Sequence, residues 1–181
     1  MAVIAKESQC KMNILVVIDM QNDFIDGALG TKEAQQIVPK VIEKINNFDG
    51  KIIYTQDTHY NDYLETNEGR HLPVEHCIDG SDGHAIKDVI YKEGSLVFKK
   101  NTFGSYRLID YLKELNRTEK IDSVTLIGVC TDICVISNAL TIKTFFPEID
   151  ITVDSTCCAG VTPQSHQTAL DAMKPCQINI V

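Results

Sequence analysis

Six apolar runs of strand length recur along the sequence, separated by segments with helical spacing. The runs are rich in valine and isoleucine and lack a clean alternation of apolar and polar positions. This composition is typical of strands in a parallel sheet that is covered on both faces. The runs are residues 14–19, 51–56, 95–100, 123–128, 150–155 and 176–181.

Three segments between these runs show the apolar spacing of amphipathic helices. They are residues 38–48, 105–116 and 162–173. Pro39 is predicted to begin the first helix, because a helix does not need the N–H of its first residue. Thr162 is the predicted N-cap of the third helix, with Pro163 as its first residue. Strands that alternate with helices predict right-handed crossovers, and hence a three-layer α/β/α sandwich with a central, mainly parallel, Rossmann-like sheet.

The length of 181 residues favours a single domain. We assign this domain to residues 12–181 and interpret residues 1–11 as an N-terminal extension. The extension lacks the apolar core of a signal peptide, and no apolar run approaches the roughly 20 residues of a membrane span. We therefore expect a cytoplasmic protein without a membrane partner.

The formal net charge is -8, and the 17 lysine and arginine residues are scattered without a basic stripe. This charge distribution argues against a nucleic-acid partner and favours a small molecule. Hydrophobic residues make up 44% of the chain and charged residues 23%, which is typical of a globular protein with a buried core. The seven cysteines are odd in number and irregularly spaced, so we expect reduced thiols and no disulfide framework.

Several residues with chemical potential stand where predicted strands end. Asp19 and Lys100 each close a strand, and Asp57 and His59 follow another. A fourth strand leads into the turn 130–134, which has a cysteine at each end. Because the chemistry of such a sandwich lies at the carboxyl ends of its strands, we expect these residues to meet at one edge of the sheet.

The turn GVCTDIC has three interpretations: a disulfide between Cys130 and Cys134, half of a metal site, or a catalytic thiol. No second Cys/His pair has zinc-finger spacing, and the expected compartment disfavours a disulfide. Residues 132–145 are predicted to continue as a helix with Cys134 in the first turn, where the helix N-terminus lowers a thiol pKa and can hold an oxyanion. Asp19 could take the thiol proton, and Lys100 would favour the ionised thiol.

Residues 57–83 interrupt the alternation with a long segment that is rich in Asp, Glu, His, Asn and Gly. The segment is too polar to be core, and a loop of this length inside a compact domain is usually functional. Asp57 and His59 can present an oxygen and a nitrogen to one ion. A later glutamate with His76 can complete a mixed shell that suits zinc, iron or manganese.

Three motifs, VVIDMQNDF, KKNTFGS and GVCTDICV, occur in this order across the chain. Together they resemble the isochorismatase-like cysteine hydrolases, the superfamily that includes the nicotinamidases (pyrazinamidases). The resemblance implies an isochorismatase-like hydrolase fold and a catalytic triad of Asp19, Lys100 and Cys134. It also implies a cis peptide bond before Cys130 and an oxyanion hole formed by the backbone N–H groups of Cys130 and Cys134.

The nicotinamidase branch also has metal ligands in the segment that corresponds to the polar loop. The resemblance implies that the ligands here are Asp57, His59, Glu68 and His76. Glu65 and His71 compete with Glu68 for its place. The bound ion would be a divalent metal, with zinc as the first candidate and iron or manganese as alternatives.

The reaction that the resemblance implies is hydrolysis of nicotinamide to nicotinate and ammonia through a thioester on Cys134, a step in NAD salvage. Phe24 and Phe103 are expected to wall the substrate ring, since the chain has no tryptophan. One alternative is the same fold acting on another small amide, a ureido acid or an enol ether. Another is a non-catalytic or redox α/β protein in which Cys130 and Cys134 form a disulfide. Family members are often oligomers, which leaves a homo-oligomer open.

Overall fold

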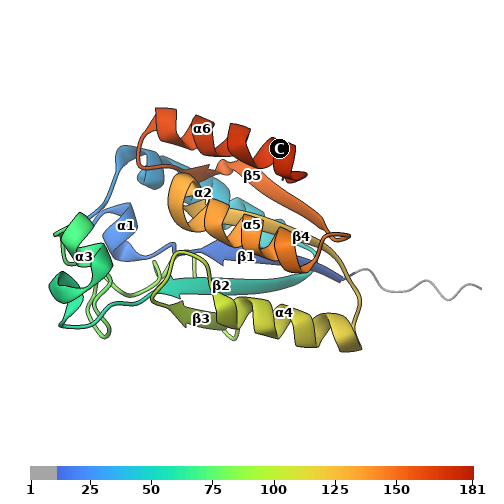
Figure 1. Cartoon of the computed structure of the whole chain (residues 1–181), viewed down its shortest axis with the longest axis horizontal. Coiled ribbons are helices and arrows are strands. Elements are labelled where there is room, and N and C mark those ends of the chain that lie inside the picture. Colours follow the sequence, from blue (N-terminus) through green and yellow to red (C-terminus); the bar gives the residue numbers. More distant parts are fainter. Residues whose placement is uncertain (1–11) are drawn as a thin grey trace, which may run out of the picture.

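The computed structural model describes residues 12–181, and the expected extension, residues 1–11, lies outside the described residues. Each of the six predicted runs contributes a strand, although the last contributes only two residues, and the strands join in one parallel sheet with the order β3-β2-β1-β4-β5-β6 (Figure 1). The strands are β1 (Met12–Ile18), β2 (Lys51–Asp57), β3 (Leu96–Lys100), β4 (Ile121–Val129), β5 (Asp150–Ala159) and β6 (Asn179–Ile180).

Helices cover both faces of this sheet (Figure 1). The longer helices are α2 (Lys32–Asn47), α4 (Tyr106–Thr118), α5 (Ile136–Phe145) and α6 (Pro163–Met173). Short helical turns are α1 (Asn22–Ile25), η1 (Tyr63–Glu65), α3 (Asn67–His71), η2 (Thr131–Val135) and η3 (Lys174–Cys176). Leu112 of α4, Ile142 of α5 and Leu170 of α6 pack in one apolar core, while Val41 and Ile45 of α2 pack in the other. The predicted three-layer α/β/α sandwich is confirmed.

The central strand, β1, joins the two cores. Its residues from Ile14 to Ile18 have no exposed surface, and complete burial of such a side chain contributes about 1.5–3 kcal/mol. β1 pairs with β2 on one side and with β4 on the other, so the order of the strands reverses between β1 and β4. Ligands of open parallel sheets bind at the carboxyl ends of the strands beside such a reversal.

Helix α2 begins earlier than predicted. It starts at Lys32, where Thr31 caps it by accepting a hydrogen bond from the N–H of Ala34 (3.0 Å). The predicted start at Pro39 is therefore wrong, because Pro39 lies inside the helix. A proline there removes the hydrogen bond to the carbonyl of Gln35. Both residues are exposed, so water can satisfy that carbonyl.

The last predicted strand, residues 176–181, is largely a turn. η3 ends at Cys176, and Gln177 then adopts a left-handed backbone conformation with φ of 63°. Only Asn179 and Ile180 pair with β5. The apolar composition of this run reflects burial rather than strand pairing, since Ile178 is buried although it lies before the strand begins.

Residues 57–83 are more ordered and more buried than their composition suggested. The segment contains η1 and α3, and Thr66 caps α3 by accepting a hydrogen bond from the N–H of Gly69 (3.0 Å). Tyr63 and His76 are buried, although the segment was interpreted as too polar for the core. These side chains can be buried because they pack and bond with one another.

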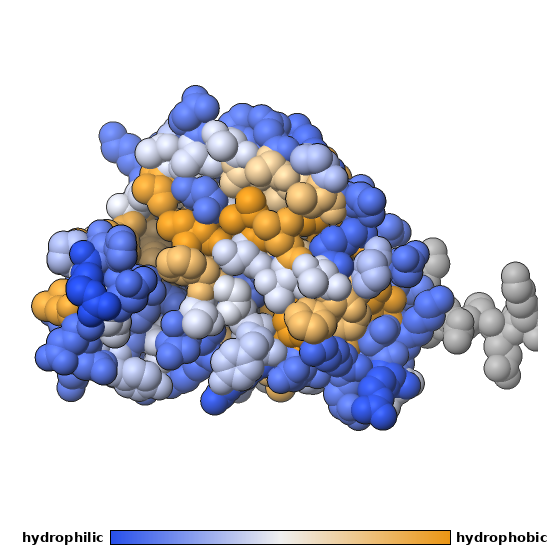
Figure 2. Space-filling model, in the orientation of Figure 1, coloured by the Kyte–Doolittle hydropathy of each residue, from blue (hydrophilic) through white to orange (hydrophobic). Residues whose placement is uncertain are grey.

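The visible surface is mostly hydrophilic, with apolar side chains gathered over α5 and between α5 and α6 (Figure 2). Leu140 and Phe145 of α5 are among the exposed large apolar residues, as is Val161 just before α6. Among residues 12–181, no helix combines the length and the apolar character that a membrane crossing requires.

Candidate active site

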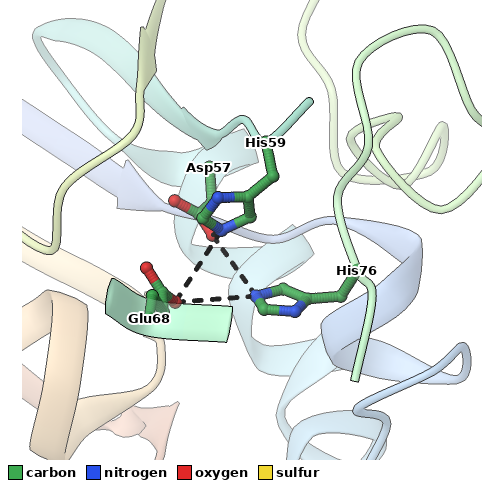
Figure 3. Close-up of side chains that lie close together, drawn as sticks. All are labelled: Asp57, His59, Glu68 and His76. Carbon is green, nitrogen blue, oxygen red and sulfur yellow. Dashed lines mark hydrogen bonds and ion pairs between the residues drawn. The ribbon is translucent and has the colours of Figure 1, made fainter. Parts of the chain in front are cut away.

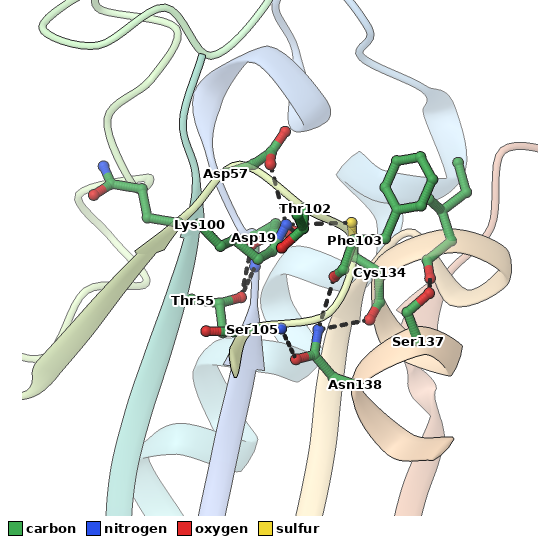
Figure 4. A network of polar contacts seen from close by, with 12 residues as sticks. Asp19, Thr55, Asp57, Lys100, Thr102, Phe103, Ser105, Cys134, Ser137 and Asn138 are labelled. Carbon is green, nitrogen blue, oxygen red and sulfur yellow. Dashed lines mark hydrogen bonds and ion pairs between the residues drawn. The ribbon is translucent and has the colours of Figure 1, made fainter. Parts of the chain in front are cut away.

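Asp19, Lys100 and Cys134 meet at the carboxyl edge of the sheet (Figure 4). Asp19 directly follows β1, Lys100 is the last residue of β3, and Cys134 lies in η2 after β4. The Lys100 ammonium lies 2.7 Å from Asp19 Oδ2 and 3.4 Å from Cys134 Sγ. All three residues are buried, and Asp19 has no exposed surface. The structure therefore brings an acid, a cation and a thiol into one small cluster.

The backbone and one neighbouring hydroxyl fix the Asp19 carboxylate. Asp19 has a φ of 48°, a left-handed conformation that turns the chain sharply at the end of β1. The Thr55 hydroxyl of β2 donates to Asp19 Oδ1 (2.6 Å) and accepts from the Asp19 N–H (3.3 Å). Oδ1 is thereby held by Thr55, and Oδ2 faces Lys100.

The turn that carries Cys134 contains the cis peptide bond that the family resemblance implied. The peptide bond between Val129 and Cys130 is cis. The Cys130 carbonyl accepts hydrogen bonds from the N–H groups of Ile133 and Val135, each at 3.1 Å. η2 is a π-helical turn that leads directly into α5, and such turns are often found at functional sites. Cys130 and Cys134 are both free thiols.

Burial and neighbouring charges set the protonation of the cluster. Burial raises the pKa of Cys134 well above its ordinary value, and the Asp19 carboxylate adds to this effect more than Lys100 opposes it. The pKa of the resting thiol is therefore raised, which is the opposite of the direction expected from a helix N-terminus alone. Burial also raises the pKa of Asp19, despite the Lys100 ammonium.

Lys100 remains a cation in this setting. Burial alone would lower the pKa of its ammonium, but the neighbouring carboxylates, Asp19 first and then Asp57, hold it well above the ordinary value. A protonated thiol beside a carboxylate of raised pKa can pass its proton to that carboxylate when sulfur attacks.

A second cluster, the metal-ligand cluster, consists of Asp57, His59, Glu68 and His76 (Figure 3). One ligand atom from each of these residues lies within 4.8 Å of the others. The His59 Nε2 atom is 3.0 Å from Asp57 Oδ2 and 3.7 Å from Glu68 Oε1. The His76 Nε2 atom is 3.7 Å from Asp57 Oδ2 and 3.8 Å from Glu68 Oε1. Ligands of one zinc-sized ion lie about 3–3.5 Å apart, so these spacings suit a single divalent metal ion.

Glu68 is the glutamate that reaches this cluster. It lies in α3, whose N-cap Thr66 orients the first helical turn. Its two competitors, Glu65 and His71, are exposed and are not part of the cluster. Partial burial and the Asp57 carboxylate raise the pKa of Glu68. Two carboxylates that converge in this way favour a cation between them.

Neighbouring groups orient the two imidazoles of the metal-ligand cluster. His76 Nδ1 lies 2.8 Å from the Val74 carbonyl, so it carries a proton and leaves Nε2 free as a ligand. Tyr63 packs edge-on against both rings, with centroid distances of 4.7 Å to His59 and 5.1 Å to His76. Tyr63 was not selected from the sequence, and its ring supplies aromatic packing against both histidines of the cluster in a chain without tryptophan.

Asp57 connects the metal-ligand cluster to the catalytic cluster. Its Oδ1 accepts a hydrogen bond from the Lys100 ammonium (3.1 Å), while its Oδ2 faces His59 and His76. The pairing of β2 with β3 places Asp57 directly beside Lys100, so the contact follows from strand register. A ligand held by the metal-ligand cluster would therefore lie next to the triad.

The side chain of Gln21 holds the backbone of Asp57, and this residue was not selected from the sequence. Gln21 is fully buried, and its amide pairs with both backbone polar groups of Asp57: Nε2 donates to the carbonyl (2.9 Å) and Oε1 accepts from the N–H (2.7 Å). Its position in the motif DMQNDF, two residues after Asp19, was the available signal. Thr55 and Asn138 were missed in the same way, because each looks like an ordinary polar residue of a strand or helix.

The two predicted wall residues belong to different segments around the site. Phe24 is half-buried, and its ring packs edge-on against His76 with a centroid distance of 5.5 Å. Phe103 lies in the loop after Lys100 with 48% of its surface exposed. Phe24 is thus beside a metal ligand, while Phe103 belongs to the loop that continues from the catalytic lysine.

Comparison with known proteins places this geometry in a family. The Isochorismatase domain family matches residues 13–181. A curated nicotinamidase of Schizosaccharomyces pombe is 24% identical over 205 residues, covering 92% of this chain and 91% of the relative. The pyrazinamidase of Pyrococcus horikoshii, solved in complex with zinc, has a TM-score of 0.81 and 28% identity over 93% of this chain and 98% of its own. The N-carbamoylsarcosine amidase of Thermoplasma acidophilum has a TM-score of 0.73 and 29% identity over 93% and 95%. Since the family match runs from β1 to the last residue, the chain belongs to the Isochorismatase domain family.

Proposed function

We propose that this protein is a metal-containing cysteine amidohydrolase that converts nicotinamide to nicotinate and ammonia. The observation that carries the proposal is Asp57, which presents one oxygen to the catalytic lysine and the other to the metal-ligand cluster. The steps at the thiol use Asp19, Lys100 and Cys134, so the sharing of Asp57 is what joins the metal-ligand cluster to them. Similarity to a nicotinamidase and to a zinc-containing pyrazinamidase supports the choice of substrate.

In the first half of the reaction, Cys134 attacks the carboxamide carbon. Asp19 accepts the thiol proton as the carbon–sulfur bond forms, and the carbonyl oxygen becomes an oxyanion. The backbone N–H groups of Cys130 and Cys134 are the proposed donors to this oxyanion. Asp19 then returns the proton to the amide nitrogen, the carbon–nitrogen bond breaks, and ammonia leaves a thioester on Cys134.

In the second half, Asp19 deprotonates a water molecule that attacks the thioester. The carbon–sulfur bond breaks, Cys134 recovers its proton from Asp19, and the product leaves as nicotinic acid, which releases its remaining proton to solvent to give nicotinate. Lys100 keeps its positive charge throughout, so it stabilises whichever of Asp19 and Cys134 is anionic. The raised pKa of Asp19 suits this role, because a general base of low pKa would accept the proton less readily.

The residues proposed to hold the metal are Asp57, His59, Glu68 and His76. We propose zinc, which suits two imidazole nitrogens and two carboxylate oxygens and is present in the Pyrococcus horikoshii pyrazinamidase. A metal there would polarise and orient the substrate ring or a water molecule beside the thiol. Phe24 and Phe103 are the proposed ring walls, on the metal side and on the lysine-loop side.

We propose that residues 12–181 act as one catalytic domain in the cytoplasm. The odd number and irregular spacing of the seven cysteines support a reducing compartment.

The test is ammonia release from nicotinamide by the purified wild type, with and without a chelator. Cys134→Ala should reduce kcat by at least about 1000-fold, because the nucleophile is lost. Cys176→Ala is the matched control, since that thiol is exposed and lies outside the catalytic cluster. Activity in the chelated enzyme equal to that of the metal-loaded enzyme would contradict a functional metal site.

Hydrolysis of a ureido acid is the second candidate function. It is favoured by the similarity to the N-carbamoylsarcosine amidase. A panel of small amides, ureido acids and an enol ether, assayed at equal concentration, separates the candidates. Wild-type turnover of a ureido acid with none of nicotinamide would replace the proposed substrate while leaving the thiol mechanism intact.

A further inference from the structure

Asn138 is a buried polar residue that the catalytic steps do not use. It lies on α5, one turn after Cys134, and has no exposed surface. Its Nδ2 donates to the carbonyls of Cys134 (2.8 Å) and Phe103 (3.1 Å), and its Oδ1 accepts from the N–H of Ser105 (2.9 Å) (Figure 4). Both donors and the acceptor of its amide are therefore used.

The hydrogen bonds of Asn138 exceed what its own helix requires. Its neighbour Ser137 illustrates the local pattern, in which the hydroxyl donates to the carbonyl of Ile133 one turn earlier (2.6 Å). Asn138 makes the equivalent bond to Cys134 and also reaches the loop 101–105. Its two additional bonds link the start of α5 to the segment that follows β3, and we call this pair of bonds the loop latch.

The loop latch does not hold the backbone of Lys100. The Lys100 backbone is held separately, since its carbonyl accepts from the N–H of Thr58 (2.7 Å) and its strand pairs with β2. Phe103 lies beyond that support, and its ring is about half exposed. Gly104 rests close to α5, where an added Cβ would lie 3.4 Å from Thr141 Oγ1. The position of Phe103 therefore depends on the latch.

We propose that Asn138 is a positioning residue that fixes Phe103 relative to Cys134, so that the Phe103 ring forms a wall for the aromatic ring of the substrate. This inference rests on the proposed function, because it assigns a role in binding an aromatic amide. Asn138 acts through Phe103, because its side-chain amide donates hydrogen bonds to the backbone carbonyls of both Cys134 and Phe103.

Kinetics of Asn138→Ser, Phe103→Ala and the double variant test this role. Serine at position 138 can keep the bond to the Cys134 carbonyl, as Ser137 does with its own partner, but it is too short for the loop latch. Asn138→Ala serves as a second variant if the serine variant does not fold. Ser137→Ala is the matched control, because its hydroxyl bonds within the helix alone.

Asn138→Ser should raise KM for nicotinamide about 10-fold while kcat stays within about 3-fold, because Lys100 and Asp19 remain in place. Phe103→Ala should raise KM to a similar extent. The double variant should show no more than the effect of Phe103→Ala, since both changes remove the same wall. Ser137→Ala should leave both constants unchanged, and a purely structural role would lower the melting temperature without moving KM.

A KM for Asn138→Ser equal to that of Ser137→Ala would overturn the proposal. Full additivity of the two changes in the double variant would also overturn it, because Asn138 would then act independently of Phe103. Amide hydrogen exchange at Ser105, whose N–H bonds to Asn138, should accelerate in the serine variant whether or not nicotinamide is the substrate. Inactivity of the wild type towards nicotinamide would refute the proposed function instead, and the same cycle would then use the amide that the enzyme hydrolyses.

Discussion

Lys100→Met should strongly destabilise the protein, because it leaves two buried carboxylates without their cation. The ammonium lies 2.7 Å from Asp19 and 3.1 Å from Asp57, and all three side chains are at most 6% exposed. At an effective dielectric constant of about 20, these attractions amount to about 6 and about 5 kcal/mol. Much of that offsets the desolvation of the charges, so we expect a net loss of about 3–5 kcal/mol in the free energy of unfolding.

Urea unfolding of Lys100→Met, followed by circular dichroism, measures this loss. Lys99→Met is the matched control on the same strand, since the Lys99 side chain is 50% exposed and pairs with Asp79 at the surface. A surface pair of this kind contributes about 0–1 kcal/mol. The double variant Asp19→Asn/Lys100→Met removes one of the two unpaired charges and should recover part of the lost stability.

Equal stability of Lys100→Met and Lys99→Met would refute the electrostatic reasoning. It would mean that Asp19 and Asp57 do not both carry charge in the folded protein. A lack of recovery in the double variant would place the loss in packing rather than in charge. In either case the nicotinamidase activity of Lys100→Met should be lost, because the cation that stabilises the anionic forms of the cluster is gone.

Three further changes test other parts of the molecule. Glu68→Gln should weaken zinc binding at least about 10-fold in equilibrium dialysis, whereas Glu65→Gln should leave zinc binding unchanged. The reverse result would make Glu65 the metal ligand in place of Glu68. Gly128→Ala should cost at least about 3 kcal/mol in urea unfolding, because the φ of 117° is strained for alanine and its Cβ would collide with the Ile18 carbonyl oxygen; wild-type stability would contradict this. Burial raises the pKa of Asp154, but the Lys44 ammonium, 2.8 Å away, opposes this effect, and the pKa is lowered overall. The Asp154 carboxylate therefore stabilises the fold above its unfolded pKa of about 3.9, and this stabilisation is lost as the pH falls through the lower folded pKa. Asp154→Asn should therefore reduce stability by about 1 kcal/mol at pH 7 and by progressively less below pH 4, and a difference that does not narrow in acid would show that the charge is not responsible.

The strands were predictable because their residues are selected by burial on both faces of a sheet. Continuous valine and isoleucine runs identify such strands, and five of the six runs matched well. The start of α2 was misread because an exposed proline inside a helix loses only a bond that water can replace. The polar segment 57–83 was misread because its composition does not reveal that its polar groups pair with one another.

The residues of the site were predictable in kind, since an aspartate, a lysine and a cysteine at strand ends must lie at one edge of a parallel sheet. Asn138 and Gln21 were not, because their importance lies in bonds to backbone atoms that are distant in sequence. Nothing in the local pattern distinguishes such an amide from one on a solvated surface.

The sequence by itself determined the parallel sandwich, the strand-end positions of Asp19, Lys100 and Cys134, and the set of side chains from which metal ligands could come. The tertiary structure decided that Glu68 rather than Glu65 joins the metal-ligand cluster, and that Asp57 is shared between two clusters. It also decided that the thiol pKa is raised rather than lowered. The physical reason is that residue type and strand pattern act along the chain, whereas charge, burial and hydrogen bonding act through space at distances that only the packed sheet and its loops define.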